Sequence, residues 1–185
     1  FGADLVFDVA NIPNFRFYIE MCEDLWVPIP PSSFASLAGA TVIGNLSASN
    51  AIIGKAEYRR SLAANQSARC IAAYLYAAAG PGESTTDLAW DGHAMIFENG
   101  NLLAQSERFA DYSQLITADI DLDRLAQDRM RQNSFSRNAF AHQERILNFR
   151  KVEIKTTPIE ERLLLERSYA RFPYIPSDPA KRDER

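Results

Sequence analysis

Cysteine and histidine are scarce in this chain of 185 residues, and their scarcity excludes several classes of protein. The two cysteines, Cys22 and Cys70, can form one disulfide at most, which excludes a small disulfide-stapled domain and favours a reducing, cytoplasmic setting. The two histidines, His93 and His142, have no CxxC or HxxxH spacing around them. We therefore expect no metal site in this chain.

Long hydrophobic runs are also absent. The longest apolar stretch, residues 70–79, falls well short of the roughly 18 residues that a membrane-spanning helix needs, so we expect no membrane segment. The chain opens on Phe1, inside an apolar run, and shows no signal-peptide pattern. We expect it to be a piece of a longer protein.

The net charge is small, −4, but it is unevenly distributed. Residues 1–123 carry a net charge of −9, whereas residues 124–185 carry +5. The second segment mixes both signs and has few aromatic side chains in repeating positions. That pattern is typical of a solvated, partner-facing surface, and we expect no nucleic-acid binding.

The overall composition is that of one globular core, with 46% hydrophobic, 11% aromatic and 24% charged residues. Strand-like and helix-like patterns alternate, and an Asn-Gly pair between two apolar runs predicts a hairpin. This order predicts a layered α/β domain. The predicted strands are 15–21, 41–46, 71–79, 93–98, 101–105 and 112–120, and the predicted helices are 32–38 (capped by Ser32 and Ser33), 55–69 and 122–132 (capped by Asp121).

Regular patterning fades beyond about residue 133, where prolines become frequent in an extended, linker-like tail. We therefore place a domain over residues 1–132 and a linker over residues 133–185. The prolines of the tail are Pro158, Pro173, Pro176 and Pro179.

Cys22 is the candidate nucleophile. It follows the predicted strand 15–21 and precedes a proline-rich loop, so its thiol would be exposed at the end of a rigid strand beside free backbone N–H groups. A thiolate also needs a neighbouring base or cation, and Glu23 and Asp24 would instead raise its pKa. The alternative is a small buried hydrophobe, because free cysteines are often buried. Cys70 is expected in the core.

Two polar residues follow the next predicted strand, at the edge of the sheet where α/β proteins bind ligands. Ser49 lies in a Ser- and Asn-rich turn, and its alternative role is to bond the backbone of that turn. Lys55 is the one charged residue between Phe34 and Ala56. It could hold a substrate carboxylate or simply face solvent.

Several blocks of this sequence together resemble the nitrilase superfamily of carbon–nitrogen hydrolases, and most closely the glutaminase domain of bacterial glutamine-dependent NAD+ synthetases. The resemblance covers nearly the whole chain. Its main blocks are Ile19-Glu20-Met21-Cys22-Glu23-Asp24-Leu25-Trp26, Ile53-Gly54-Lys55-Ala56-Glu57-Tyr58-Arg59-Arg60, Gly82-Glu83-Ser84-Thr85-Thr86-Asp87-Leu88-Ala89-Trp90-Asp91-Gly92 and Arg171-Phe172-Pro173-Tyr174-Ile175-Pro176.

The resemblance implies part of an αββα sandwich with a Cys-Glu-Lys triad, followed by a linker toward a synthetase domain. It implies that Cys22 attacks L-glutamine and that Glu23, Ser49 and Lys55 bind this substrate. The family's general-base Glu and oxyanion-binding Lys precede the matching segment, so we expect this chain alone to be inactive.

For the parent enzyme, the resemblance implies two linked reactions. Glutamine is hydrolysed to glutamate, and the ammonia passes to the enzyme's own synthetase domain. That domain uses ATP and Mg2+ to amidate nicotinate adenine dinucleotide to NAD+. No cofactor is implied for the present segment, and a homo-oligomer is expected.

Two other functions remain open on the sequence. The chain could be a non-catalytic structural or interaction module that supports assembly of the sandwich. It could also be a stand-alone nitrilase-type amidase, although the proline-rich tail argues against that reading.

Overall fold

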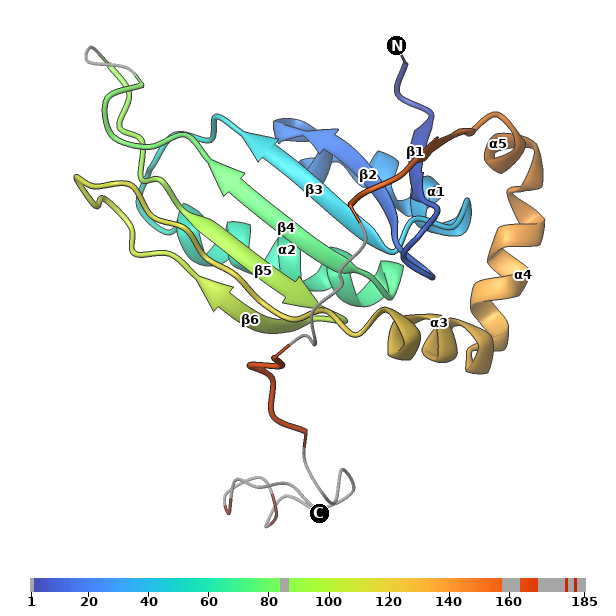
Figure 1. Cartoon of the computed structure of the whole chain (residues 1–185). Coiled ribbons are helices and arrows are strands. Elements are labelled where there is room, and N and C mark those ends of the chain that lie inside the picture. The colour runs from blue at the N-terminus through green and yellow to red at the C-terminus, as the bar shows by residue number, and fades with distance from the viewer. Residues whose placement is uncertain (1, 84–86, 158–163, 170–178, 180–181, 183–185) are drawn as a thin grey trace.

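A single mixed β-sheet is the frame of the molecule (Figure 1). The computed structural model describes residues 2–83, 87–157, 164–169, 179 and 182. Within them, the strands are β1 (Leu5–Val9), β2 (Arg16–Met21), β3 (Val42–Ser47), β4 (Ala73–Ala78), β5 (Ala94–Glu98), β6 (Asn101–Gln105) and β7 (Arg150–Ile154). The helices are the 3-10 helix η1 (Cys22–Trp26) and the α-helices α1 (Pro31–Leu37), α2 (Lys55–Cys70), α3 (Leu122–Arg131), α4 (Asn133–Ala141) and α5 (Gln143–Leu147).

The seven strands lie in the order β6-β5-β4-β3-β2-β1-β7. The three central strands β2, β3 and β4 are parallel, whereas β1 and the β5–β6 hairpin are antiparallel to their inner neighbours. Parallel neighbours need helical crossovers, and α1 and α2 supply them on one face. The carboxyl ends of β2 and β3 therefore meet at one edge of the sheet.

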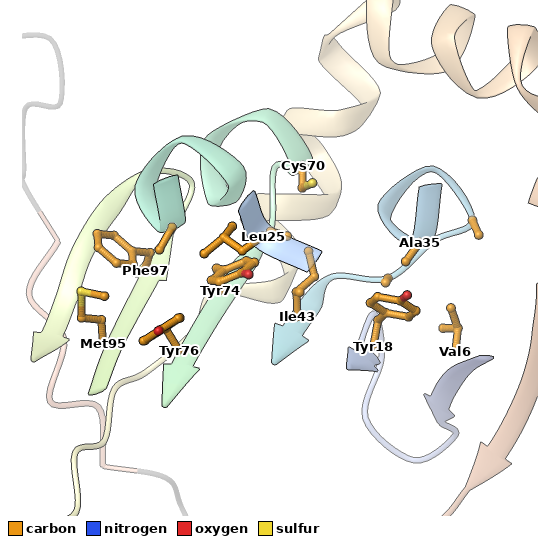
Figure 2. Close-up of a cluster of buried hydrophobic side chains, with 14 of the residues drawn as sticks. Val6, Tyr18, Leu25, Ala35, Ile43, Cys70, Tyr74, Tyr76, Met95 and Phe97 are labelled. Carbon is orange, nitrogen blue, oxygen red and sulfur yellow. The ribbon is translucent and has the colours of Figure 1, made fainter. Parts of the chain in front are cut away.

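The hydrophobic core lies between the central strands and the helices α1 and α2, as Figure 2 shows. Every second residue of β4 points into it, which is the period that a half-buried strand requires. The largest fully buried apolar side chains in this layer are Ile43, Tyr74, Tyr76, Met95 and Phe97.

The opposite face of the sheet carries exposed apolar side chains. Ile19, Met21 and Leu46 are 41%, 57% and 53% exposed, and Met21 pairs with Leu46 across β2 and β3. A single sheet covered by helices on one face is one half of an αββα sandwich. The predicted fold class is therefore confirmed, with the chain providing one α layer and one β layer.

Most of the predicted elements are confirmed, including the hairpin at Asn99-Gly100 and the cap of α3, where Asp121 accepts a hydrogen bond from the Arg124 N–H at 2.9 Å. Two details are wrong. The segment 112–120 forms no strand in the structure, because it pairs with no neighbouring strand. Ser32 and Ser33 do not cap α1: their hydroxyls accept hydrogen bonds from Gln66 Nε2 instead.

The loss of periodicity predicted that regular structure ends near residue 132, but the structure continues beyond it. Helices α4 and α5 follow, and β7 pairs in parallel with β1 at the edge of the sheet. Phe149 packs against Tyr18, with their ring centroids 6.1 Å apart, and this contact holds the segment to the core. The description of residues 133–154 as an extended linker is therefore wrong, while the position at which the domain ends stays a prediction.

Candidate active site

Cys22 occupies a sharp turn at the carboxyl end of β2. Its φ angle is 47°, in the left-handed region that non-glycine residues rarely adopt. Such strained residues gather at functional sites, where the surrounding structure holds them in place. Here, the Asp24 carboxylate accepts a hydrogen bond from the Met21 N–H at 2.8 Å, and Asn45 Nδ2 donates to the Cys22 carbonyl at 3.4 Å. Cys22 thus lies at the end of a strand, as predicted, and the sharp turn there, which we call the elbow, is held from both sides.

A pocket of about 390 Å3 opens in front of the elbow. All four residues that the sequence singled out line this pocket: Cys22, Glu23, Ser49 and Lys55. They come from three segments: Cys22 and Glu23 begin η1, Ser49 follows β3, and Lys55 begins α2. The structure therefore brings the predicted residues together, while their individual roles stay predictions.

Lys55 and Glu23 place opposite charges around the thiol. Lys55 Nζ donates a hydrogen bond to Asn50 Oδ1 at 2.9 Å and lies 5.4 Å from the centre of the Trp26 ring. Glu23 is exposed in the first turn after the nucleophile. A free amino acid carries one carboxylate and one ammonium group, and this pair of side chains complements both charges.

Ser49 is buried, and its Oγ atom has no hydrogen-bond partner in the described part of the chain. A buried hydroxyl without a partner costs free energy that a ligand can recover. Ser49 lines the pocket, although its Oγ atom is itself covered by neighbouring atoms. The sequence left open that the Ser49 hydroxyl bonds the backbone of its own turn, and no such hydrogen bond is present in the described residues.

No described side chain forms a hydrogen bond with the Cys22 thiol, so the described residues provide no general base for it. Glu20, two residues upstream, is buried and already occupied: its carboxylate accepts hydrogen bonds from the Ser32 N–H at 3.0 Å and from the Tyr74 hydroxyl. Burial raises the pKa of Glu20 above its usual value. Glu20 therefore supports the elbow strand and does not activate the nucleophile.

Cys70 lies in a different environment. It is buried at the end of α2, where Gln66 Nε2 approaches its sulfur at 3.2 Å. Burial raises the pKa of the Cys70 thiol to about 11, so it stays protonated near neutral pH. Both cysteines are free thiols, and Cys22 is the accessible one.

A buried ion pair, which contacts Ser49 of the pocket lining, was missed by sequence reasoning. Arg59 and Asp91 are both 0% exposed, and Arg59 Nη1 contacts both Asp91 carboxylate oxygens at 3.0 and 3.1 Å. The available signal was the spacing of Lys55 and Arg59, which puts two cations on one face of α2. Arg59 and Asp91 are 32 residues apart in the sequence, so local patterns could not show that they form a pair.

The described residues contain neither a metal-binding cluster nor a membrane-spanning helix. No group of three or more His, Cys, Asp or Glu side chains is arranged to hold a metal ion. No helix in the described ranges is long and apolar enough to cross a membrane.

Comparison with solved structures supports the fold class. The chain superposes on a carbon–nitrogen hydrolase from Helicobacter pylori with a TM-score of 0.57 at 17% identity, over 76% of this chain and 51% of that one. Nit3 of Saccharomyces cerevisiae, a member of the nitrilase superfamily, gives a TM-score of 0.53 at 17% identity, over 64% and 42%. The fold is therefore that of nitrilase-superfamily carbon–nitrogen hydrolases.

Comparison with known sequences defines the relatives. The chain is 50% identical over 98% of its length to the glutamine-dependent NAD+ synthetase of Mycobacterium tuberculosis and 49% identical to that of Mycobacterium leprae. It spans 27% of the length of these relatives. No family model matches the chain. The resemblance to glutamine-dependent NAD+ synthetases is confirmed, and the chain is homologous to a segment of them.

Proposed function

We propose that this chain is the nucleophile-bearing segment of a glutaminase, and that Cys22 forms a thioester with glutamine. The observation that carries this proposal is the single pocket that joins Cys22, Glu23, Ser49 and Lys55. Identity of about 50% to glutamine-dependent synthetases over almost the whole chain supports glutamine as the substrate.

The charges of the pocket orient the substrate. Lys55 binds the α-carboxylate of glutamine, Glu23 binds its α-ammonium group, and Ser49 donates or accepts one hydrogen bond with the same end of the molecule. These contacts leave the side-chain amide free to reach the Cys22 sulfur at the elbow. The backbone N–H of Glu23, next to the nucleophile, then faces the developing oxyanion.

The reaction proceeds in two halves. A base takes the proton of the Cys22 thiol, the thiolate attacks the amide carbon, and the C–N bond breaks as the leaving nitrogen receives a proton to become ammonia. Water then attacks the thioester, which releases glutamate and restores the thiol. The base and a second oxyanion donor are a Glu and a Lys from outside this chain, in line with the absence of a described base at Cys22.

In the whole protein, the ammonia passes to a synthetase domain that consumes ATP and amidates nicotinate adenine dinucleotide to NAD+. The similarity to glutamine-dependent NAD+ synthetases supports this assignment. We place the protein in the cytoplasm, where two free thiols remain reduced.

The test measures ammonia and glutamate release by the full-length protein that carries this chain. Cys22→Ala abolishes glutamine hydrolysis under the proposal, whereas Cys70→Ala retains it. Equal glutamine hydrolysis by the wild type and Cys22→Ala would contradict the proposal and favour a structural module. Turnover of simple aliphatic amides in preference to glutamine would favour an amidase.

The apolar face of the sheet leads to a second proposal about assembly. Ile19, Met21 and Leu46 pack against a further sheet of the sandwich in the whole protein, which itself forms a homo-oligomer. The isolated chain should self-associate, because this apolar face is uncovered. It should also be inactive, because the general base lies outside it. Sedimentation of the isolated chain as a monomer at all concentrations would contradict this proposal.

A further inference from the structure

Arg59 of the buried ion pair contacts Ser49, which lines the pocket, and lies on the same helix as Lys55, which also lines it. Besides its two contacts with Asp91, Arg59 donates from Nη2 to the main-chain carbonyl of Ser49 at 3.4 Å. Arg59 also lies one turn after Lys55 on α2. One guanidinium therefore touches the Ser49 loop and shares a helix face with Lys55.

The start of α2 needs such a support, because its own cap provides none. Gly54, at the N-cap position, has a φ of 79° and no side chain, and no side chain caps the helix there. An uncapped helix start frays more readily. Lys55, the first residue of the helix, is therefore positioned by contacts further along, and Arg59 is the buried residue among the first five of the helix.

Asp91 keeps the guanidinium in place. Burial on its own raises the pKa of Asp91, but hydrogen bonds from Arg108 and the charge of Arg59 outweigh it and hold this pKa below its usual value. Arg108 Nε donates to Asp91 Oδ2 at 3.0 Å, and the His93 N–H donates to Oδ1 at 3.2 Å. The carboxylate is thus fully ionised and anchored from three directions.

Arg59 does not line the pocket, so it has no direct contact with a ligand there. We infer that Arg59, clamped by Asp91, is a positioning residue that sets the spacing between Ser49 and Lys55 and thereby the affinity for the amino-acid end of glutamine. This inference rests on the proposed function. A merely structural ion pair would affect folding without changing substrate affinity.

The test compares two reagents on Cys22 in the full-length protein. The diazoketone analogue of glutamine labels Cys22 with saturation kinetics, because it binds the pocket first. Iodoacetamide is small and neutral and labels the same thiol without using Ser49 or Lys55. The variant Arg59→Met/Asp91→Leu removes both charges together, which avoids leaving a lone buried charge.

Under the inference, the double variant raises the half-saturating concentration of the diazoketone tenfold or more and changes the iodoacetamide rate less than threefold. Arg108→Gln is the matched control: it removes another cation from Asp91 without touching Ser49 and should change the half-saturation less than threefold. A change of threefold or less in the double variant, or an equal rise in Arg108→Gln, overturns the inference.

Arg59→Lys decides the matter if the double variant does not fold. Its ammonium group keeps a positive charge beside Asp91 but lacks the fork that reaches the Ser49 carbonyl as well. The same rise in half-saturation is expected, and an unchanged value overturns the inference. Failure of the proposed function gives a distinct result: the wild type then shows no saturation with the diazoketone while iodoacetamide still labels Cys22.

Discussion

Each end of the parallel strands β2, β3 and β4 contains an arginine that donates to main-chain carbonyls, and the two arginines have different surroundings: Arg59 is fully buried, whereas Arg129 is half-buried. At the carboxyl end, Arg59 is neutralised by Asp91 and reaches one carbonyl, that of Ser49. At the amino end, Arg129 from α3 reaches four carbonyls, and no ion pair to a carboxylate is recorded for it in the described residues. Of the two, only Arg59 contacts a residue of the Cys22 pocket, Ser49, whose hydroxyl has no partner among the described residues.

Arg129 closes the amino end of the strands. Its guanidinium donates to the carbonyls of Ala40 at 2.5 Å, Cys70 at 2.9 Å, Ile71 at 3.1 Å and Ser36 at 3.4 Å. These carbonyls lie at or just beyond the ends of α1 and α2, where helices leave carbonyls without partners and the helix dipole is negative. The cation satisfies them and ties α3 to both crossover helices.

Within one sheet, the amino ends of the strands contribute to stability and the carboxyl ends form the pocket. The amino end satisfies its backbone groups internally and leaves little for a ligand to do. The carboxyl end keeps a strained cysteine, an unpartnered serine hydroxyl and two opposite charges around a pocket. We therefore expect substitutions at the carboxyl end to change activity, and substitutions at the amino end to change the free energy of unfolding.

The largest expected effect is at the carboxyl end, from Cys22→Ser in the full-length protein. Glutamine-driven NAD+ synthesis should fall by roughly a thousandfold or more, because a hydroxyl replaces the thiolate nucleophile. Synthesis driven by added ammonia should persist, since it bypasses this pocket. Cys70→Ser is the control and should retain both reactions. Loss of the ammonia-driven reaction in Cys22→Ser would contradict the assignment.

The next effect belongs to the amino end. Arg129→Met should lower the free energy of unfolding by about 3 kcal/mol, because several buried carbonyls lose a charged donor. Denaturant titration measures this change, and Arg131→Met, an exposed arginine on the same helix, is the control. The iodoacetamide rate at Cys22 should not change. A stability equal to that of the Arg131 variant would show that the carbonyls have other partners.

Lys55→Met tests the charge at the pocket. Its KM for glutamine should rise by roughly thirtyfold, equivalent to about 2 kcal/mol, because a charge-assisted hydrogen bond to the substrate carboxylate is lost. Lys55→Arg keeps the charge and should stay within a fewfold of the wild type. Steady-state kinetics decide this, and a fall in kcat with unchanged KM would assign Lys55 a role in the chemical step.

The smallest expected effect is a pH dependence at Cys70. Burial raises the pKa of its thiol to about 11, so the unfolded chain releases this proton at lower pH than the folded one. Its stabilising contribution is complete only well below pH 9, the ordinary pKa of the thiol, and falls as pH rises toward 11, by about 1.4 kcal/mol at pH 10.

Measuring this effect requires a difference between variants. Burial also raises the pKa values of Tyr18, Tyr74 and Tyr76, so stability falls in alkali for several reasons. The free energy of unfolding should decline less steeply between pH 8.5 and 10 in Cys70→Ala than in Cys22→Ala. Identical slopes would show that the Cys70 thiol is not desolvated.

Local signals allowed most of the elements to be predicted from the sequence. The Asn99-Gly100 pair specifies the hairpin, Asp121 specifies the start of α3, and the apolar run after Cys70 specifies β4. Each signal acts over a few residues, through turn geometry, capping or side-chain alternation. Cys22, Ser49 and Lys55 could be named as candidates for the same reason, since each follows or begins a recognisable element.

Only the tertiary structure decided how distant segments meet. β7 joins β1 across more than a hundred residues, Arg59 pairs with Asp91, and Arg129 finds the ends of two helices. Short-range patterns carry no information on such contacts, because the free energy that selects them comes from burial and charge neutralisation after the chain has folded. The sequence by itself determined the strands β2 to β6 and the candidate residues that follow β2 and β3. Assembly of the sheet placed these residues around one pocket and set a buried ion pair against one of them, Ser49.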